Sequence, residues 1–277
     1  PPYSDFNFVS MWSWDIRGEM GVSELNDNLV VRFNDYLTGE PFYSFLGNKK
    51  VNETVETLLK QCKSENLRAV LKLVPEDSIK DLDRGKFKIL EDIDNFDYIY
   101  YIPHISKLKG NKYETHRNLI NQFSKKHPSW KVNVINFKEI QHKYDILNLY
   151  KEWLKNKGGN AALNKAYENE FLALKKLLSI RDLSKHNINC FAVYVEKNLI
   201  GFIINERVND HNIIHFEKAH IRYKGSYPFL MQQNSRILEN FNLKYLNFEQ
   251  DLGVKALRFT KGKLGPSHFL KKYLVTY

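Results

Sequence analysis

The chain has 277 residues, 43% of them apolar and 14% aromatic, which is enough for a packed core and excludes a largely disordered protein. Its formal net charge of +10 predicts an anionic partner such as RNA, a lipid surface or a phosphate-rich cofactor, although a basic composition without function is the competing interpretation. No apolar run is long enough to span a bilayer, and Cys62 and Cys190 fit no metal or redox spacing. We therefore predict a cytoplasmic protein without a catalytic metal, with peripheral membrane association as an alternative.

The first half alternates between the periodicities of strands and helices. A short buried helix is predicted within residues 3–14, because Phe6, Val9 and Trp12 have helical spacing. Further elements follow in chain order: strands at 28–33 and 42–47, a helix at 52–65, strands at 67–74, 87–92 and 98–102, and a helix that ends near 126.

The second half predicts a sheet interrupted by helices. In chain order the elements are a strand at 131–137, helices at 144–157 and 169–183, strands at 189–196, 199–208 and 212–221, a helix at 228–241, a strand at 244–250, a helix at 253–262 and a last strand at 271–277. The dipeptide Lys197-Asn198 predicts a tight hairpin between two of the strands.

Two Lys-Gly loops suggest an internal repeat. "KLKGNKY" (107–113) and "RYKGSY" (222–227) both lie between a predicted strand and a predicted helix. We interpret them as degenerate copies of one unit and predict two domains, residues 1–130 and 131–277, with the second as the catalytic half. Chance recurrence of Lys-Gly before helices remains the alternative.

The second loop has the composition of an anion site. The start of a helix exposes unpaired N–H groups, and Gly225 would allow a phosphate to approach the backbone closely. Arg222, Lys224, Ser226 and Tyr227 add charged and hydroxyl donors, so this loop is the predicted binding site for a phosphate-bearing donor substrate. The simpler alternative is a helix entry with Ser226 as its cap.

The order of elements around this loop resembles that of GNAT acyltransferases. Their pyrophosphate loop follows the pattern Arg/Gln-x-x-Gly-x-Gly/Ala, which Arg222 and Gly225 match, whereas Tyr227 replaces a small residue. A bulky ring there would crowd the pyrophosphate, so the resemblance leaves acetyl-coenzyme A binding in doubt.

Five segments in order resemble a more specific family. They are "DNFDYIY" (94–100), "LKGNKYETHRNLINQF" (108–123), "FEKAH" (216–220), "KGSY" (224–227) and "NFEQDLGVKALRFTKGKLGP" (247–266). Together they are similar to the C-terminal domain of phosphatidylglycerol lysyltransferases, which is related to the Fem-type aminoacyltransferases, although the family's "KRNHIN" is "HRNLIN" here.

This resemblance implies an α/β (α+β) fold of two tandem GNAT-like domains, each with a mixed, mostly antiparallel sheet flanked by helices. It also implies direct transfer of an aminoacyl group from aminoacyl-tRNA to a lipid or small-molecule acceptor, with no tightly bound cofactor. An N-acyltransferase that uses acyl-coenzyme A and a non-catalytic module for RNA or anionic lipid are the alternatives.

Carboxylates near the ends of two predicted strands are the candidates for catalysis. Glu217 with Lys218 in "FEKA", and Glu249 with Asp251 in "FEQD", would lie where a GNAT-type sheet opens. A carboxylate there would orient or deprotonate the nucleophile, and Lys218 would support the oxyanion. The basic residues predicted to bind the phosphate-bearing substrate include Arg258 and Lys261. A structural ion pair between Asp251 and Arg258 is the alternative for those two residues.

Overall fold

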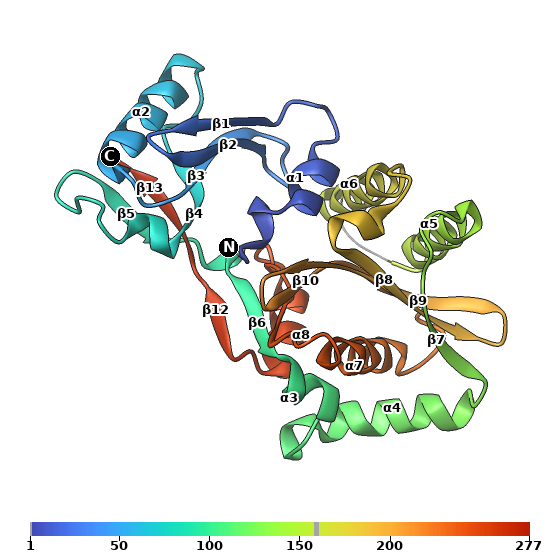
Figure 1. The fold of residues 1–277 in the computed structure, drawn as a ribbon. Helices are drawn as coiled ribbons and strands as arrows, with labels where there is room; N and C mark the ends of the chain where they lie inside the picture. The colour runs from blue at the N-terminus through green and yellow to red at the C-terminus, as the bar shows by residue number, and fades with distance from the viewer. Residues whose placement is uncertain (1, 158–160) are drawn as a thin grey trace.

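The computed structural model describes residues 2–157 and 161–277, which form three sheets with helices packed against them (Figure 1). The α-helices are α1 (Phe8–Trp14), α2 (Val51–Ser64), α3 (Ile102–Lys107), α4 (Glu114–Lys126), α5 (Ile140–Lys155), α6 (Ala161–Leu178), α7 (Ser226–Glu239) and α8 (Lys255–Leu264). The strands are β1 (Gly21–Leu25), β2 (Asn28–Asn34), β3 (Pro41–Leu46), β4 (Leu71–Pro75), β5 (Lys88–Glu91), β6 (Asp97–Tyr101), β7 (Trp130–Val134), β8 (Ile188–Val195), β9 (Asn198–Val208), β10 (His211–Ala219), β11 (Tyr245–Asn247), β12 (His268–Leu270) and β13 (Lys272–Thr276). Short 3₁₀ turns are η1 (Ser4–Phe6), η2 (Glu76–Ile79), η3 (Ile93–Asn95), η4 (Asn111–Tyr113) and η5 (Leu183–His186).

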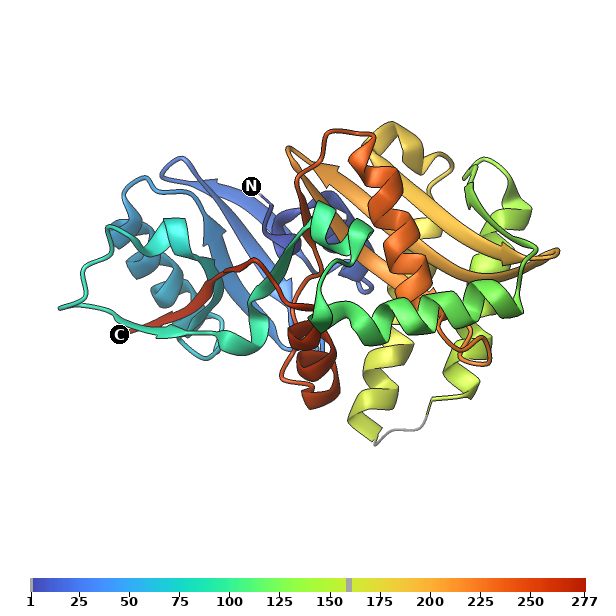
Figure 2. The same cartoon turned by 90° about the horizontal axis from the view of Figure 1, so that it is seen from below.

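The largest sheet has the strand order β12-β6-β11-β10-β9-β8-β7. Its pairs are antiparallel except for β10 and β11, which are parallel and are connected through α7. Side chains alternate between the faces of a strand, so β8 places Phe191 and Val193 in the core under α3, α4 and α7. Cys190 and Ala192 pack on the other face under α5 and α6. Figures 1 and 2 show these two helical layers on either side of the sheet.

The N-terminal lobe contains two smaller sheets, β1-β2-β3 and β4-β13-β5. Helix α2 covers them, because Val55, Leu58 and Leu59 recur at helical spacing and are buried in one core with residues of β2, β3, β4 and β13. The predicted α/β (α+β) class, with mixed and mostly antiparallel sheets flanked by helices, is confirmed.

The sheets do not separate at residue 130, where the sequence analysis placed a domain boundary. β6 precedes that boundary, yet it lies between β11 and β12 in the large sheet. β13 is the last strand of the chain, yet it lies between β4 and β5 in the N-terminal lobe. The two lobes therefore exchange strands, which Figure 1 shows as the green β6 beside red β12 and the red β13 beside cyan β4.

The two Lys-Gly loops are not in equivalent surroundings. The first follows helix α3 instead of a strand, and nothing lies within 4 Å of where a Cβ of Gly110 would be. The second lies against α4, the helix that the first loop introduces: a Cβ on Gly225 would be 2.3 Å from the carbonyl oxygen of Leu119. The unit β10–α7–β11 instead has the same element order as β3–α2–β4, and α7 and α2 are both 14 residues long.

Most predicted elements are present, and Cys62 and Cys190 are both buried and free. The strands β1 and β12 and the helix α3 were not predicted. Within the described ranges, no helix combines the length and the apolar character needed to cross a membrane.

Candidate active site

Two pockets meet beside the ends of β10 and β11. The α7 pocket has a volume of about 450 Å³ and is lined by Ile105, Leu108, His116, Tyr227, Pro228, Met231, Thr260 and Leu264 together with the shared residues below. The α6 pocket has a volume of about 330 Å³ and extends towards Trp14, Tyr36, Ala166, Tyr167, Glu170, His215, Glu249 and Gln250. The two pockets share Trp153, Lys157, Glu217, Lys218, Phe248, Leu257 and Lys261. They therefore form one two-sided cleft.

Glu217 lies at the junction of the two pockets without a hydrogen-bond partner for one of its oxygens. Its Oε1 atom is buried and accepts no hydrogen bond from the described residues. Burial raises the pKa of Glu217 to about 7, although the positive charges of Lys218 and Lys261 oppose this shift. A half-buried carboxylate with a pKa near neutrality and a free oxygen is suited to accept a proton from a substrate.

Lys218 follows Glu217 in β10 and faces α5 and α6. Its Nζ is 2.5 Å from Oε1 of Glu170, and it lies over the rings of Trp153 and Tyr150 at 4.6 and 5.2 Å from their centroids. An ammonium group has three N–H donors, and this ion pair occupies one of them. Glu217 and Lys218, both candidates from the sequence, line the same cleft in the structure, and the ion pair with Glu170 leaves two N–H donors of Lys218 for other partners.

Lys261 lines both pockets, but its ammonium group is bound by the protein. It donates to the carbonyl oxygens of Phe248, Glu249 and Gln250 at 2.5, 3.3 and 2.7 Å. Burial lowers the pKa of Lys261 to about 8, although nearby carboxylates oppose this shift. Lys261 therefore fixes the segment after β11 and leaves no obvious donor for the phosphate contact predicted from the sequence.

Glu249 belongs to a buried triad rather than standing free. His215 donates from Nδ1 to Glu249 at 2.7 Å and from Nε2 to Glu206 at 2.9 Å. Burial alone would lower the pKa of His215, but the two carboxylates outweigh it and raise this pKa to about 9. The imidazole is therefore a cation at neutral pH, and the role predicted for Glu249 as a free catalytic base finds no support in this geometry.

Asp251 and Arg258 form the ion pair that the sequence analysis considered as an alternative. The fully buried carboxylate of Asp251 accepts from Nε and Nη2 of Arg258 at 2.9 and 2.8 Å, from the Tyr98 hydroxyl at 2.5 Å and from the Gly253 N–H at 2.8 Å. Burial opposes ionisation, but these donors outweigh it and keep the pKa of Asp251 below its usual value. Arg258 also pairs with Asp94 at 2.6 Å. Both groups are engaged in anchoring α8.

The predicted anion site in loop 222–227 is divided between different surroundings. Arg222 and Lys224 are exposed, and Arg222 lines a separate pocket with Glu152 and His220. Ser226 is buried, and its N–H donates to the carbonyl oxygen of Tyr223. Tyr227 lines the α7 pocket. On the side where a Cβ of residue 225 would lie, Gly225 is in contact with the backbone of α4, so this face of the glycine packs against protein.

Three further cleft residues were not predicted from the sequence. Trp153 and Glu170 come from α5 and α6 and contact Lys218, and His116 comes from α4. The Nδ1 atom of His116 is buried and has no hydrogen-bond partner among the described residues, and burial lowers the pKa of His116. Only His116 had a sequence signal, because it lies in "HRNLIN"; Trp153 and Glu170 lie in ordinary amphipathic helices. In the part of the chain that the structure describes, no group of three or more histidine, cysteine or acidic residues is arranged to hold a metal ion.

The strand order and the cleft define the class of protein. Antiparallel β8, β9 and β10, a loop, α7, the parallel strand β11 and α8 follow one another as in GNAT-like acyltransferases. Residues 3–276 match the family described as phosphatidylglycerol lysyltransferase, C-terminal. The chain belongs to this family, and family and fold together support an acyltransferase.

Solved structures share the fold over nearly the whole chain. A conserved protein of unknown function from Bacteroides thetaiotaomicron is 22% identical with a TM-score of 0.79, covering 99% of this chain and 91% of that one. The C-terminal domain of a putative lysylphosphatidylglycerol synthetase from Agrobacterium fabrum is 12% identical with a TM-score of 0.62, covering 95% and 86%. L-PGS from Bacillus licheniformis is 13% identical with a TM-score of 0.62, covering 98% and 87%.

A curated relative is an uncharacterized protein of Mycoplasmoides gallisepticum, 26% identical over 181 residues, or 64% of this chain. The match covers 55% of that relative, so it extends over about half of the relative's length.

Proposed function

We propose that this chain transfers an aminoacyl group from aminoacyl-tRNA directly to a hydroxyl or amine of a lipid or small-molecule acceptor. Family membership supports acyl transfer to such an acceptor. The observation that carries the proposal is Glu217, a carboxylate with one partner-free oxygen at the junction of two pockets. Two substrates that enter from opposite pockets would meet at this group.

Glu217 acts as the general base in this proposal. It accepts the proton of the attacking hydroxyl while the acceptor oxygen bonds to the carbonyl carbon of the aminoacyl ester. The bond from that carbon to the ribose oxygen of the tRNA then breaks, and the proton passes to the released ribose hydroxyl. The remaining donors of Lys218 stabilise the oxyanion that forms between these steps.

The two pockets differ in the group that they suit. Ile105, Leu108 and Met231 make the wall of the α7 pocket apolar, which favours a hydrocarbon-bearing acceptor. Helix α8 borders this pocket and exposes Leu257 and Phe259 beside Lys255 and Lys263, a surface suited to the edge of an anionic membrane. Glu170, His215 and Glu249 give the α6 pocket a charged wall, which favours the aminoacyl end of the donor.

Replacement of Glu217 tests the proposed base. Glu217→Gln should reduce turnover by about 10²- to 10⁴-fold, the usual contribution of general base catalysis, with the melting temperature retained. Turnover would be measured with tRNA charged with labelled amino acids and with phosphatidylglycerol vesicles as acceptor. Glu168→Gln is the matched control, because Glu168 is an exposed carboxylate on α6 outside both pockets.

The pH dependence of turnover gives a second measurement of the same group. A general base is active when deprotonated, so kcat/KM should rise with pH and level off above a pKa near 7. Wild-type turnover after Glu217→Gln would refute the assignment. If wild-type protein binds RNA or vesicles but turns over no charged tRNA, the non-catalytic alternative is favoured.

The coenzyme A alternative is disfavoured by the position of α4 over Gly225. Calorimetry with acetyl-coenzyme A should therefore detect no binding tighter than about millimolar, a weak affinity for a cofactor. Micromolar binding would instead favour an N-acyltransferase that uses acyl-coenzyme A.

A further inference from the structure

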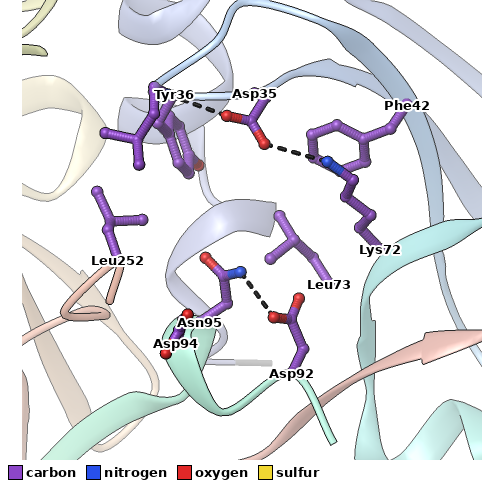
Figure 3. Close-up of a pocket in the computed structure, with 10 residues that line it drawn as sticks. Asp35, Tyr36, Phe42, Lys72, Leu73, Asp92, Asp94, Asn95 and Leu252 are labelled. Atoms are coloured by element: carbon purple, nitrogen blue, oxygen red, sulfur yellow. Dashed lines mark hydrogen bonds and ion pairs between the residues drawn. The ribbon is translucent and has the colours of Figure 1, made fainter. Parts of the chain in front are cut away.

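A small acidic pocket lies between the N-terminal lobe and the turn that precedes β6. It has a volume of about 170 Å³ and combines Asp35 and Tyr36 after β2, Lys72 on β4, and Asp92 and Asp94 near η3 (Figure 3). We call it the aspartate pocket. Three of the residues that line it, Asp35, Asp92 and Asp94, carry carboxylates, and Lys72 is the one lining residue with a positive charge.

Asp92 is the group in this pocket that has no ionic partner. It is 8% exposed, and its Oδ1 atom accepts a hydrogen bond from Nδ2 of Asn95 at 2.9 Å. Its Oδ2 atom is buried and has no partner among the described residues. Figure 3 shows this second oxygen directed towards Leu73, away from the oxygen that is bonded to Asn95. A buried acceptor that binds nothing is costly, and a donor from a ligand would remove that cost.

The other carboxylates of the pocket are already engaged. Asp35 accepts from the N–H groups of Leu37 and Thr38 and from Nζ of Lys72, the last at 3.2 Å. Asp94 is paired with Arg258. Asp92 is therefore the acceptor that remains for a ligand.

Lys72 shows that the walls of this pocket can hold an ammonium group. Its ammonium group lies between the Asp35 carboxylate and the face of the Phe42 ring, 5.1 Å from the ring centroid. The pocket thus already holds one primary ammonium group, supplied by the protein itself. Asp92 feels the charge of Lys272, but no described cation forms a salt bridge with it, and the volume admits only a small molecule.

We propose that the aspartate pocket binds the primary ammonium group of a small amine, with Asp92 as its anionic anchor. The bound amine donates to the free oxygen of Asp92, on the opposite side of the pocket from Lys72. Tyr36, Leu37 and Leu252 line both this pocket and the α6 pocket, so the occupant lies one side chain away from the cleft. The proposal does not depend on the reaction in that cleft.

Titration with methylammonium chloride at constant ionic strength tests this site. Amide chemical shifts of Leu37, Thr38 and Asn95 should change saturably, whereas tetramethylammonium, which has no N–H donor, should produce no saturable change. Asp92→Asn should weaken methylammonium binding about tenfold or more, because it removes a charge-assisted hydrogen bond. Asp81→Asn removes an exposed carboxylate outside the pocket and should leave the affinity unchanged.

A second variant predicts a change of the opposite sign. Lys72→Met removes the internal cation and releases Asp35, so methylammonium should bind more tightly than to the wild type. Asp92→Asn is nearly isosteric and relieves an unpaired buried carboxylate, so melting curves should confirm that both asparagine variants remain folded. Absence of a saturable shift in the wild type, or equal affinity in wild type and Asp92→Asn, would overturn the proposal.

Discussion

The carboxylate of Asp251 has all of its acceptor capacity in use, whereas that of Glu217 has a free oxygen. Both residues were candidates for catalysis on the basis of their positions near strand ends. A carboxylate that receives four hydrogen bonds is stabilised as an anion and is a poor base, because its pKa is lowered. The contacts therefore separate a structural carboxylate from a reactive one.

Asp251→Asn should lower stability rather than block chemistry. It weakens two charge-assisted bonds to Arg258, so we expect a loss of about 1.5–3 kcal/mol in the free energy of unfolding in urea. Asp94→Asn is the matched control: Asp94 contacts the same guanidinium but is 59% exposed, so its loss should cost under about 1 kcal/mol. A large fall in turnover for folded Asp251→Asn would show instead that this carboxylate takes part in catalysis.

At the scale of residues, the sequence indicates which side chains line the cleft better than it indicates which hydrogen bonds they make. The segment "FEKA" contributes Glu217 and Lys218 to the lining of the cleft, at the end of a strand beside a helix N-terminus, where such a sheet opens. The partners of Glu249 and Lys261 could not be predicted. They depend on His215 in another strand and on backbone carbonyls, and neither contact leaves a spacing in the sequence.

The contact between α4 and loop 222–227 gives Gly225 a structural role in helix packing. Phe123 of α4 packs against Phe229 of α7, with ring centroids 4.5 Å apart and ring planes tilted by 41°, and the α4 backbone contacts the Cβ side of Gly225. Glycine is needed here for close approach to a helix, whereas the sequence pattern suggested close approach to a phosphate.

Gly225→Ala and Gly110→Ala test whether Gly225 is needed for the close approach of α4 in addition to its backbone conformation. Both glycines have positive φ, 88° and 92°, but their strain differs: alanine should cost about 1–2 kcal/mol at position 225, in the left-handed region, and about 1–3 kcal/mol at position 110, whose ψ of 168° only glycine readily adopts. Only the Cβ at position 225 meets α4, which should cost about 1–3 kcal/mol more through overpacking. Urea unfolding measures both losses, and a loss for Gly225→Ala no larger than its backbone strain of about 1–2 kcal/mol would mean that α4 is not held tightly over the loop.

Among the elements, long periodic segments were predicted well and short ones were not. The segment "YIYYI" reads as a strand throughout, but Ile102-Pro103 begins α3, because proline is tolerated in the first turn of a helix. β1 has a largely exposed pattern without clear alternation of apolar residues, and β12 has only three residues. Local periodicity therefore gave the order of elements but missed these pieces.

The pairing of strands across the whole molecule was beyond a reading of local pattern. β6 pairs with β11 across more than 140 residues, and β13 pairs with β4 across about 200, although nothing in either strand specifies its partner. The order of elements along the chain suggests a boundary at residue 130, but β6 and β13 each pair with strands from the other side of that position.

Cutting the chain at residue 130 should therefore prevent both fragments from folding on their own. The fragment 131–277 lacks β6, and the fragment 1–130 lacks β13, so each has an internal gap in a sheet. We expect neither to show a cooperative urea transition by circular dichroism, and we expect a mixture of the two to recover one. A cooperative transition of 131–277 alone, with a midpoint like that of the intact chain, would contradict this.

The exchanged strands also affect how the protein reaches its structure during synthesis. β4 and β5 leave the ribosome long before the strand that lies between them, because β5 ends at Glu91 and that strand is formed by residues 272–276. Until then the nascent N-terminal lobe exposes unpaired strand edges, which are templates for aggregation. β6 likewise has an unpaired edge until β11 has been synthesised. The N-terminal lobe therefore cannot complete its sheet before β13 has been synthesised. We expect the yield of folded protein in cells to depend on chaperones that protect the unpaired edges.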